Sequence, residues 1–166
     1  EYKMQSSKID RIKDLVEQLN AASESYYAKD QEIEARYDAA ELKNDQAAME
    51  QARTDHFALE ADIQAQGKPF ELLYSLYAAA MKVGNENIDI SELHEYQDAA
   101  TLIASFREYG IEAFTFSSGW SSAAESAWAF LQNGCTLAGM VEINGPHKAF
   151  GSDEYEKRPA FLFRVQ

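Results

Sequence analysis

The chain has 166 residues, of which 46% are hydrophobic and 12% aromatic, so it holds enough apolar surface to fold rather than stay disordered. Its 15 basic and 28 acidic residues leave a net charge of −13. This charge disfavours direct binding to nucleic acid or to an anionic membrane, because both repel it. Cys135 is the single cysteine, which excludes an intramolecular disulfide framework and a multi-cysteine metal site. No apolar run approaches the roughly 18 residues of a membrane span, and residues 1–5 show no signal segment, so we expect a cytoplasmic protein.

The first 66 residues contain neither Gly nor Pro and predict a long helical arm. Their apolar residues recur at alternating steps of three and four, as in a coiled-coil seam. The seam comprises Ile9, Ile12, Val16, Leu19, Tyr26, Ile33, Tyr37 and Ala40, and an offset second series comprises Leu42, Met49, Ala52, His56, Leu59 and Ile63. The offset fits either a hairpin of two helices or one helix that changes partners. Lys43-Asn44-Asp45 is the favoured turn, with Asn44 or Asp45 as a helix cap, and Asp30 is a competing break.

Residues 67–166 hold all eight Gly and all three Pro and predict a second domain, which begins with two helices. Pro69 suits the first turn of a helix that Gly84 ends. Ser91 is the expected cap of the next helix, whose apolar positions are Leu93, Tyr96, Ala100, Ile103 and Phe106. Gly110 closes that helix.

The rest of this domain predicts strands around one further helix. Residues 111–117 are apolar on both faces, which is typical of an interior strand. Ser122 and Glu125 form a capping-box pattern for a helix that ends at residues 133–134. Residues 135–143 alternate as a strand does, and Asn144-Gly145 predicts a tight hairpin into a short strand over 147–150. Residues 161–165 form the last strand.

These elements predict an α+β fold. Its long N-terminal helical arm or hairpin, residues 1–66, precedes a small mixed β-sheet with helices packed on one face, residues 67–166. The expected order in the second domain is α-α-β-α-β-β-β.

The loop over residues 117–122 carries two possible chemistries. Its backbone N–H groups and hydroxyls at a helix N-terminus suit a phosphate or another small ligand, although the same residues also suit a plain strand-to-helix turn. The candidate ligand-binding residues are Ser117, Ser118, Gly119, Ser121 and Ser122. The spacing from Gly119 to Ala123 resembles a nucleophile elbow, but only His147 follows it and the chain is too short for the sheet that a hydrolase needs. Trp120 either docks on the core or serves as a binding anchor.

Catalytic and metal-binding patterns are missing from the sequence. His56, His94 and His147 show no metal-ligand spacing, and Cys135 lies on the apolar face of its strand, where a thiol is inert. We therefore expect no enzyme activity, no metal and no cofactor.

Six acidic residues of the arm share one helical phase. They are Glu34, Asp38, Glu41, Asp45, Asp55 and Asp62. On a continuous helix they form a stripe opposite the apolar seam, where like charges cost a few tenths of a kcal/mol per pair. Such a row resembles a row of phosphates and predicts contact with a basic protein surface, with Trp120 as a further contact. The alternative is an ordinary solvated helix face.

The run Phe-Thr-Phe-Ser-Ser-Gly-Trp-Ser-Ser-Ala-Ala-Glu-Ser-Ala-Trp ends at Trp128, and Val-Glu-Ile-Asn-Gly ends at Gly145. These runs resemble small acidic proteins carried on mobile elements and prophages of gut Firmicutes. The resemblance implies an accessory protein that opposes host defence, for example as an anti-CRISPR or anti-restriction factor.

The leading functional hypothesis is a non-enzymatic protein-binding module that inhibits a basic nucleic-acid-binding defence protein, such as a CRISPR effector. One alternative is a homo-oligomeric structural protein assembled through the arm. The other is a small-ligand or phosphate-binding domain that uses the 117–122 loop.

Overall fold

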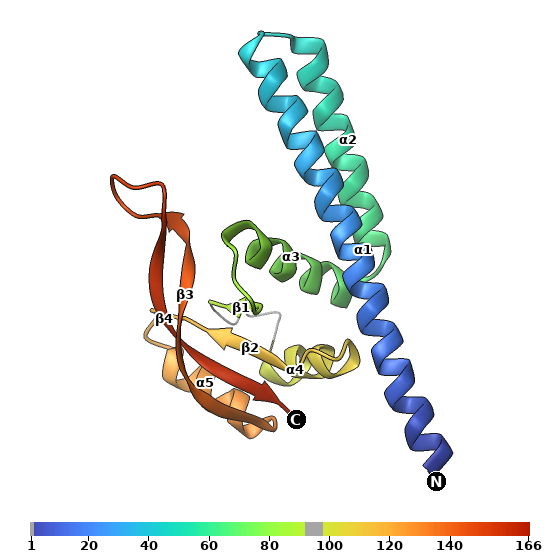
Figure 1. The fold of residues 1–166 in the computed structure, drawn as a ribbon, viewed down its shortest axis with the longest axis vertical. Coiled ribbons are helices and arrows are strands. Elements are labelled where there is room, and N and C mark those ends of the chain that lie inside the picture. Colours follow the sequence, from blue (N-terminus) through green and yellow to red (C-terminus); the bar gives the residue numbers. More distant parts are fainter. Residues whose placement is uncertain (1, 92–97) are drawn as a thin grey trace. The chain divides into compact units, whose positions relative to one another are not determined.

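The computed structural model describes the backbone of residues 2–91 and 98–166, and side chains from residue 21 onward within these ranges. Its helices and strands, in chain order, are α1 (Tyr2–Leu42), α2 (Gln46–Ala65), α3 (Lys68–Val83), β1 (Asp89–Ile90), α4 (Ala99–Glu108), β2 (Ala113–Phe116), α5 (Ala123–Gln132), β3 (Cys135–Lys148) and β4 (Tyr155–Val165) (Figure 1). The chain divides into two compact units. One comprises Glu17–Ser75, and the other comprises Glu1–Val16 with Leu76–Gln166.

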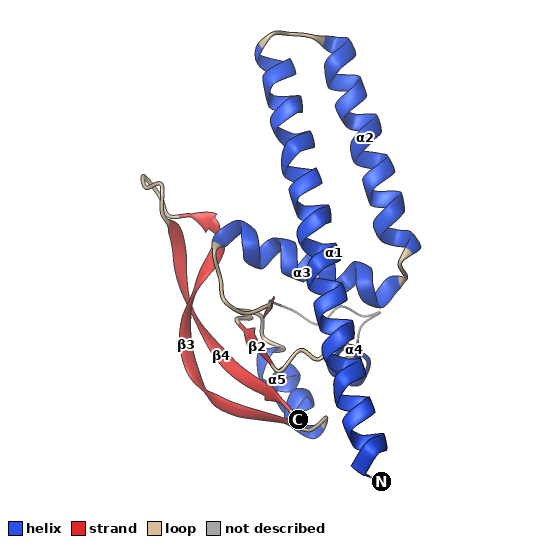
Figure 2. Ribbon diagram, turned by 45° about the vertical axis from the view of Figure 1, so that its right-hand side comes forward, coloured by secondary structure: helices blue, strands red, loops and turns tan. Residues whose placement is uncertain are grey.

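Helices α1 and α2 form a hairpin (Figure 2). The chain leaves α1 after Leu42, and Asn44 adopts the left-handed conformation at φ 52°, which short polar residues tolerate best. Asp45 then caps α2, since its Oδ1 accepts a hydrogen bond of 3.2 Å from the Ala48 N–H. The reversal therefore lies in the Lys43–Asp45 segment, and the chemistry that makes it is local.

The hairpin buries few and mostly small side chains. Ala40, Ala52, Leu59 and Ile63 are buried between its helices and at its base. Leu42, expected to open the second apolar series, is instead 91% exposed, because it is the last residue of α1 before the turn. The seam side chains before residue 21 lie outside the described residues.

The base of this unit is aromatic. Tyr26 of α1 meets Phe70 and Tyr74 of α3 edge-on, with ring centroids 6.0 Å apart in both pairs. Gln66 donates a side-chain hydrogen bond to the Tyr26 hydroxyl at 3.5 Å. These contacts hold the first turns of α3 against the hairpin.

The second unit is built on a four-stranded mixed sheet of order β1-β2-β4-β3. Strand β1 pairs in parallel with β2, whereas β4 is antiparallel to both β2 and β3. The α+β class, the mixed sheet and the interior position of the 111–117 strand are as predicted. Strand β3 forms one edge of the sheet (Figure 2).

An aromatic cluster fixes the helices on one face of the sheet. Phe114 of β2 is fully buried and lies 5.2 Å from Phe106 of α4, 5.0 Å from Phe130 of α5 and 5.4 Å from Phe163 of β4, measured between ring centroids. Phe116 also meets Phe130, at 5.3 Å. A ring so enclosed by neighbours ties β2, β4, α4 and α5 into one core.

Arg107 of α4 closes the turn between α5 and β3. Its Nη2 donates to the Asn133 carbonyl oxygen at 2.6 Å, and its Nε donates to the Gln166 carbonyl oxygen at 2.7 Å. Gly134 has φ 90°, and a Cβ there would lie 2.6 Å from Arg107 Nη2. The backbone conformation therefore favours glycine at this position, and a larger residue would also displace the Arg107 guanidinium from its bond.

Of the two helix starts predicted for this unit, the one at Ser91 is wrong and the one at Ser122 is in place but lacks the expected capping bond. Helix α4 begins after Asp98, whose Oδ1 accepts from the Thr101 N–H at 2.7 Å, and not at Ser91. The expected positions Leu93 and Tyr96 lie outside the described residues. Ser122 stands at the N-cap of α5 but makes no side-chain capping bond, because its ψ of 3° is not the extended conformation that a cap needs.

The hairpin predicted at Asn144-Gly145, with its separate strand over 147–150, is also wrong. Asn144 is inside β3, where its N–H donates to Asn85 Oδ1 and its carbonyl oxygen accepts from Asn85 Nδ2. These bonds hold the residue in the strand, and the extra residues are absorbed as an irregularity between Asn144 and Lys148. The chain turns later, where the Ala149 N–H donates to the Glu154 carbonyl oxygen and Gly151 has φ 71°.

We predict that Phe114→Ala lowers the free energy of unfolding by about 3–5 kcal/mol, because it empties the centre of the aromatic cluster. Urea denaturation followed by circular dichroism measures this change. Phe150→Ala is the matched control: Phe150 is fully exposed at the β3–β4 turn, so its loss should change stability by no more than about 0.5 kcal/mol. Equal effects of the two variants would contradict the central role of Phe114.

Candidate binding groove of the helical hairpin

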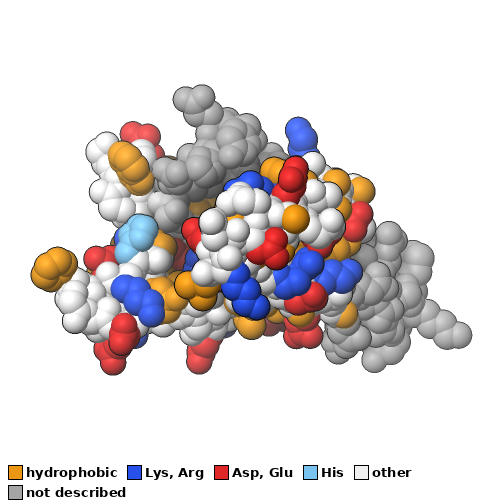
Figure 3. All heavy atoms as spheres, turned by 90° about the horizontal axis from the view of Figure 1, so that it is seen from above, with side chains coloured by type: hydrophobic (Ala, Val, Ile, Leu, Met, Phe, Trp, Pro, Cys, Tyr) orange, Lys and Arg blue, Asp and Glu red, His pale blue; other side chains and the backbone are white. Residues whose placement is uncertain are grey.

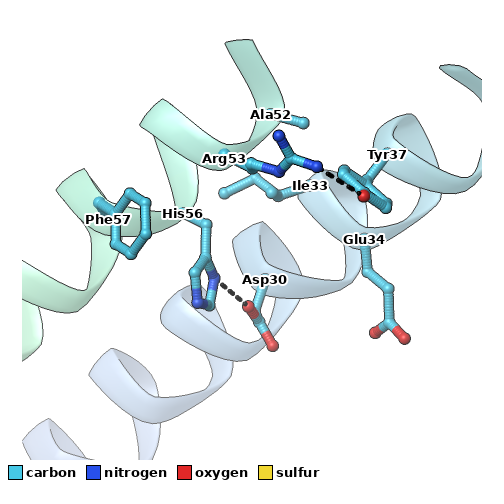
Figure 4. Close-up of a pocket in the computed structure, with 8 residues that line it drawn as sticks. All are labelled: Asp30, Ile33, Glu34, Tyr37, Ala52, Arg53, His56 and Phe57. Atoms are coloured by element: carbon cyan, nitrogen blue, oxygen red, sulfur yellow. Dashed lines mark hydrogen bonds and ion pairs between the residues drawn. The ribbon is translucent and has the colours of Figure 1, made fainter. Parts of the chain in front are cut away.

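A groove of about 370 Å³ runs between α1 and α2. It is lined by Asp30, Ile33, Glu34, Tyr37, Ala52, Arg53, His56 and Phe57 (Figure 4). The groove opens where the short side chain of Ala52, 1% exposed, stands in the helix interface. Phe57 leaves 65% of its surface in solvent beside this groove, so an apolar ring is available for contact.

The polar groups of the groove are partly paired with one another. Arg53 Nη2 donates to the Tyr37 hydroxyl at 3.1 Å, and its guanidinium lies 5.4 Å from the centroid of that ring. His56 Nδ1 lies 3.5 Å from Asp30 Oδ1, and its Nε2 lies 3.4 Å from Glu60 Oε1. Glu34, by contrast, points away from these pairs (Figure 4). The groove therefore combines an apolar floor with a rim on which the Glu34 carboxylate is available.

The first four residues of the predicted acidic stripe lie at and near the turn end of the hairpin. Glu34, Asp38 and Glu41 share a face of α1 and are exposed. Within the described residues, no hydrogen bond or ion pair engages their carboxylates. Asp45 is also exposed, but it is the α2 cap and so serves the fold as well as the surface charge.

The other two residues of the stripe are separated from the first four because the chain reverses. Asp55 and Asp62 lie on α2, and Asp62 is exposed. Asp55 instead accepts from Arg36 Nη2 at 2.6 Å and from Gln51 Nε2 at 3.0 Å. The Arg36 hydrogen bond, with that of Gln51, lowers the pKa of Asp55. Asp55 therefore belongs to a cross-helix ion pair and is not part of the candidate binding surface. Acidic and basic side chains lie next to one another at the hairpin end seen in Figure 3.

The 117–122 loop is anchored by an acidic residue. Ser117 Oγ donates to Asp89 Oδ2 and Thr115 Oγ1 donates to Asp89 Oδ1, both at 2.6 Å. Burial raises the pKa of Asp89, and these two hydrogen bonds together with Arg158 partly offset the rise. A carboxylate one hydrogen bond from Ser117 opposes a phosphate at this loop.

The remaining loop residues form a turn. Ser118 Oγ accepts from the Trp120 N–H at 3.2 Å, and the Ala123 N–H donates to the Trp120 carbonyl oxygen at 3.0 Å. Gly119, Ser121 and Ser122 are exposed, and a hollow of about 190 Å³ adjoins Ser117 and Ser118. Trp120 is 66% exposed, so of its two predicted positions the docked one is wrong and the indole is available as an anchor.

The residues weighed for catalysis and metal binding are dispersed. His56 lines the groove, His147 is exposed on β3, and His94 lies outside the described residues. Cys135 is buried, which raises the pKa of its thiol. Among the residues that the structure describes, no three His, Cys, Asp or Glu side chains gather as metal ligands, and no helix is long and apolar enough to cross a membrane.

Residues 72–165 match a family described as a domain of unknown function, DUF7698. The match covers more than half of the chain. The protein belongs to the DUF7698 family. The matched segment includes most of α3 and the whole sheet, whereas α1 and α2 precede it. No curated protein and no solved structure matches the chain.

Two surface features escaped the sequence reasoning. Phe57 and Arg53 fall outside the apolar seam, so nothing in the periodicity marked the groove that they line. The DUF7698 domain also exposes Trp128, Leu131 and Met140 by 61%, 38% and 63%. No surface role was predicted for these three residues from the sequence, and the exposed area of each side chain identifies them as surface.

We predict that Asp89 makes the fold less stable as the pH rises. The pKa of Asp89 is raised above the ordinary value of 3.8 in the folded protein, so the folded state binds the proton more tightly than the unfolded state does. Stability is therefore lost as the pH rises from 3.8 through the raised pKa of the folded state. Asp89→Asn cannot titrate and removes this loss. Urea denaturation between pH 3.5 and pH 7 should therefore show the stability of wild type falling relative to Asp89→Asn as the pH rises. A constant or growing wild-type advantage would contradict the buried carboxylate.

Proposed function

We propose that this DUF7698 protein is a non-enzymatic, cytoplasmic protein-binding module whose acidic hairpin docks on a basic surface of a partner protein. The observation that carries the proposal is the set of exposed carboxylates at Glu34, Asp38 and Glu41, which pair with no side chain in the described part of the chain and lie beside an open apolar groove. Carboxylates without intramolecular partners keep their charge available for another molecule, whereas paired ones do not.

The charge of the hairpin unit supports a basic partner. Residues 17–75 hold 13 acidic and five basic residues, for a net charge of −8. Complementary charge raises the association rate and selects against acidic partners. Nucleic acid and anionic membranes are disfavoured for the same reason.

The groove supports a helical binding element on the partner. Two antiparallel helices with an apolar hollow between them accept the apolar face of a third helix, as in other helix-in-groove complexes. Phe57 supplies an exposed aromatic anchor, and Glu34 supplies an acidic rim position for a basic side chain that flanks such a helix. The chemistry therefore suits a basic amphipathic helix.

Proteins that bind nucleic acid are the main class with large basic surfaces. A hairpin that occupies such a surface competes with phosphates, so the partner would be inhibited. The resemblance to proteins of mobile elements favours a partner in host defence, of which a CRISPR effector is one example.

We predict that neutralising four acidic residues of the hairpin abolishes binding of the partner protein. The combined variant carries Glu34→Gln, Asp38→Asn, Glu41→Gln and Asp45→Asn. Asparagine at position 45 keeps the α2 cap while it removes the charge, so the fold is retained. Tagged wild type and variant are incubated with a nuclease-treated bacterial lysate, eluted by increasing salt and compared by quantitative mass spectrometry. Wild type should retain basic nucleic-acid-binding proteins that moderate salt releases, and the variant should not.

The matched control neutralises four exposed acidic residues of the other unit and changes the net charge by the same amount. Its substitutions are Glu108→Gln, Glu112→Gln, Glu142→Gln and Glu154→Gln. This control should capture the same proteins as wild type. Undiminished capture by the hairpin variant, or equal loss in both variants, would refute a specific acidic contact.

A separate prediction concerns the apolar anchor. Phe57→Ser should weaken the affinity for the captured partner by at least about tenfold, because a buried aromatic anchor is worth about 2 kcal/mol or more in an interface. Since Phe57 is largely exposed in the free protein, its loss should leave the unfolding midpoint nearly unchanged. Leu42→Ser, at the turn and outside the groove, is the control and should bind normally. Calorimetric titration of the purified partner distinguishes the two.

A further inference from the structure

We propose that the DUF7698 domain self-associates through a two-fold contact made by α5 and the edge strand β3. The contact surface, here called the α5–β3 face, consists of Trp128, Leu131, Leu137 and Met140. The second copy of this chain is its occupant.

Helix α5 has two apolar sides and the core uses only one. Phe130 points into the aromatic cluster and is fully buried. Ala124, Ala127, Trp128 and Leu131 follow the spacing i, i+3, i+4, i+7 and therefore form a second stripe on one flank of the helix. Trp128 and Leu131 on this stripe remain 61% and 38% exposed.

The stripe lies on the flank of α5 that faces the sheet edge. Ser126 and Ala129, on the opposite flank, are half-buried. Arg107 of α4 bonds to the Asn133 carbonyl oxygen at the end of that flank. Since α4 occupies that side, the stripe with Trp128 is left beside β3.

Strand β3 adds apolar side chains to the same face. Leu137 is paired across the sheet with Phe163, and Met140 is paired with Phe161. Paired residues point to the same side of a sheet, and Phe163 contacts Phe130 of α5 at 5.4 Å. Leu137 and Met140 therefore project on the helix side, where they leave 49% and 63% of their surface exposed.

The outer edge of β3 has unpaired backbone groups. Within the described part of the chain β3 pairs only with β4. Proline and charged residues that commonly block sheet edges fall in its second half, at Glu142, Pro146 and Lys148. The first half, residues 135–141, has only the irregularity between Leu137 and Gly139. An antiparallel copy of the same strand satisfies this edge by symmetry.

Charge selects the second copy as the occupant. Residues 126–141 contain no charged side chain, although the chain carries −13 overall. A basic partner gains no electrostatic advantage on such a surface, whereas two acidic copies approach each other there with the least repulsion. An isologous contact needs no complementary sequence elsewhere, because the same apolar patch meets itself.

The four side chains supply about half of the area that a standard interface buries. The exposed parts of the four side chains amount to on the order of 400 Å² per copy, and a standard interface buries about 800 Å² per partner. The alanines of the stripe, the backbone of the strand edge and Trp120, three residues before α5, supply further area. A dimer of micromolar affinity is consistent with this size.

The test is sedimentation velocity on the full chain from 1 to 100 µM. Wild type should approach twice the 18.7 kDa chain mass as the concentration rises. Trp128→Glu on the helix and Met140→Glu on the strand should each raise the dimer dissociation constant by at least about tenfold. Both side chains are mostly exposed in the monomer, so circular dichroism should stay unchanged.

Two aromatic controls separate this face from other surfaces. Phe150→Glu, at the β3–β4 turn, and Phe57→Glu, in the hairpin groove, should dimerise as wild type does. Loss of the dimer in Phe57→Glu but not in Trp128→Glu would overturn the proposal and assign association to the hairpin. A wild type that stays monomeric at 100 µM would also overturn the proposal. This holds even if Trp128→Glu abolishes binding of a different protein, because the face would then contact that protein and not a second copy of this chain.

Hydrogen exchange distinguishes strand pairing from helix contact alone. Amides of residues 135–143 should exchange more slowly at 100 µM than at 1 µM in wild type, and this difference should vanish in Trp128→Glu. Exchange in these residues that does not depend on concentration, in a sample that is dimeric, would overturn the pairing of the two β3 edges.

Discussion

The enclosure of Phe114 by rings from α4, α5 and β4 is the interaction on which the second unit depends. Strand β2 has only four residues, so its own hydrogen bonds cannot set the sheet order. Phe114 and Phe116 point to the helices, while Thr115, between them, points to the other face and bonds to Asp89 of β1. Once β2 lies between β1 and β4, β3 pairs on the outer side of β4 and becomes the sheet edge. The exposed α5–β3 face is thus a consequence of the core.

The hairpin unit depends less on apolar burial than the second unit does and more on polar contacts. Its helices meet through small residues such as Ala40 and Ala52, so it buries little apolar surface for its length. Satisfied local groups compensate in part: Asp45 caps α2, and Arg36 bridges to Asp55 across the helices. Because the single charge of Arg36 is shared between Asp55 and Glu32, most of the acidic excess remains on the outside. The groove and the exposed carboxylates therefore have one cause. The two helices are held together by small side chains and a few polar contacts, and these leave space between the helices and most acidic side chains on the outside.

The sequence was sufficient at several turns and helix ends that local chemistry decides. The turn over residues 43–45, the end of α3 at Gly84 and the end of α5 at residues 133–134 all depend on residues within a few positions. The Asn144-Gly145 hairpin failed because Asn144 bonds to Asn85, 59 residues earlier, and no local pattern reveals that partner. Trp120 was uncertain for a related reason, since whether a ring docks depends on the space left by other elements.

The acidic residues of the candidate site also depend on contacts between residues that are distant in the sequence. The six acidic residues share a phase only on an unbroken helix, and the reversal at residues 43–45 places Asp55 and Asp62 on a different helix from Glu34 and Asp38. Periodicity cannot indicate which carboxylate then meets an arginine, because Arg36 and Asp55 become neighbours only when the hairpin closes. Sequence therefore identified the charged segment but not the members of the surface.

Charge is unevenly distributed between the two proposed surfaces, and this separation has a functional consequence. The hairpin unit carries −8, whereas residues 126–141 carry no charge at all. A surface that recognises a basic partner must stay ionised and accessible, and a surface that recognises its own copy must avoid repulsion. By keeping these requirements on different units, the chain separates its acidic groups from the uncharged residues of the proposed dimer contact. Such a dimer would present two hairpins, and a partner with two basic sites within their reach would be held more tightly by both than by either alone.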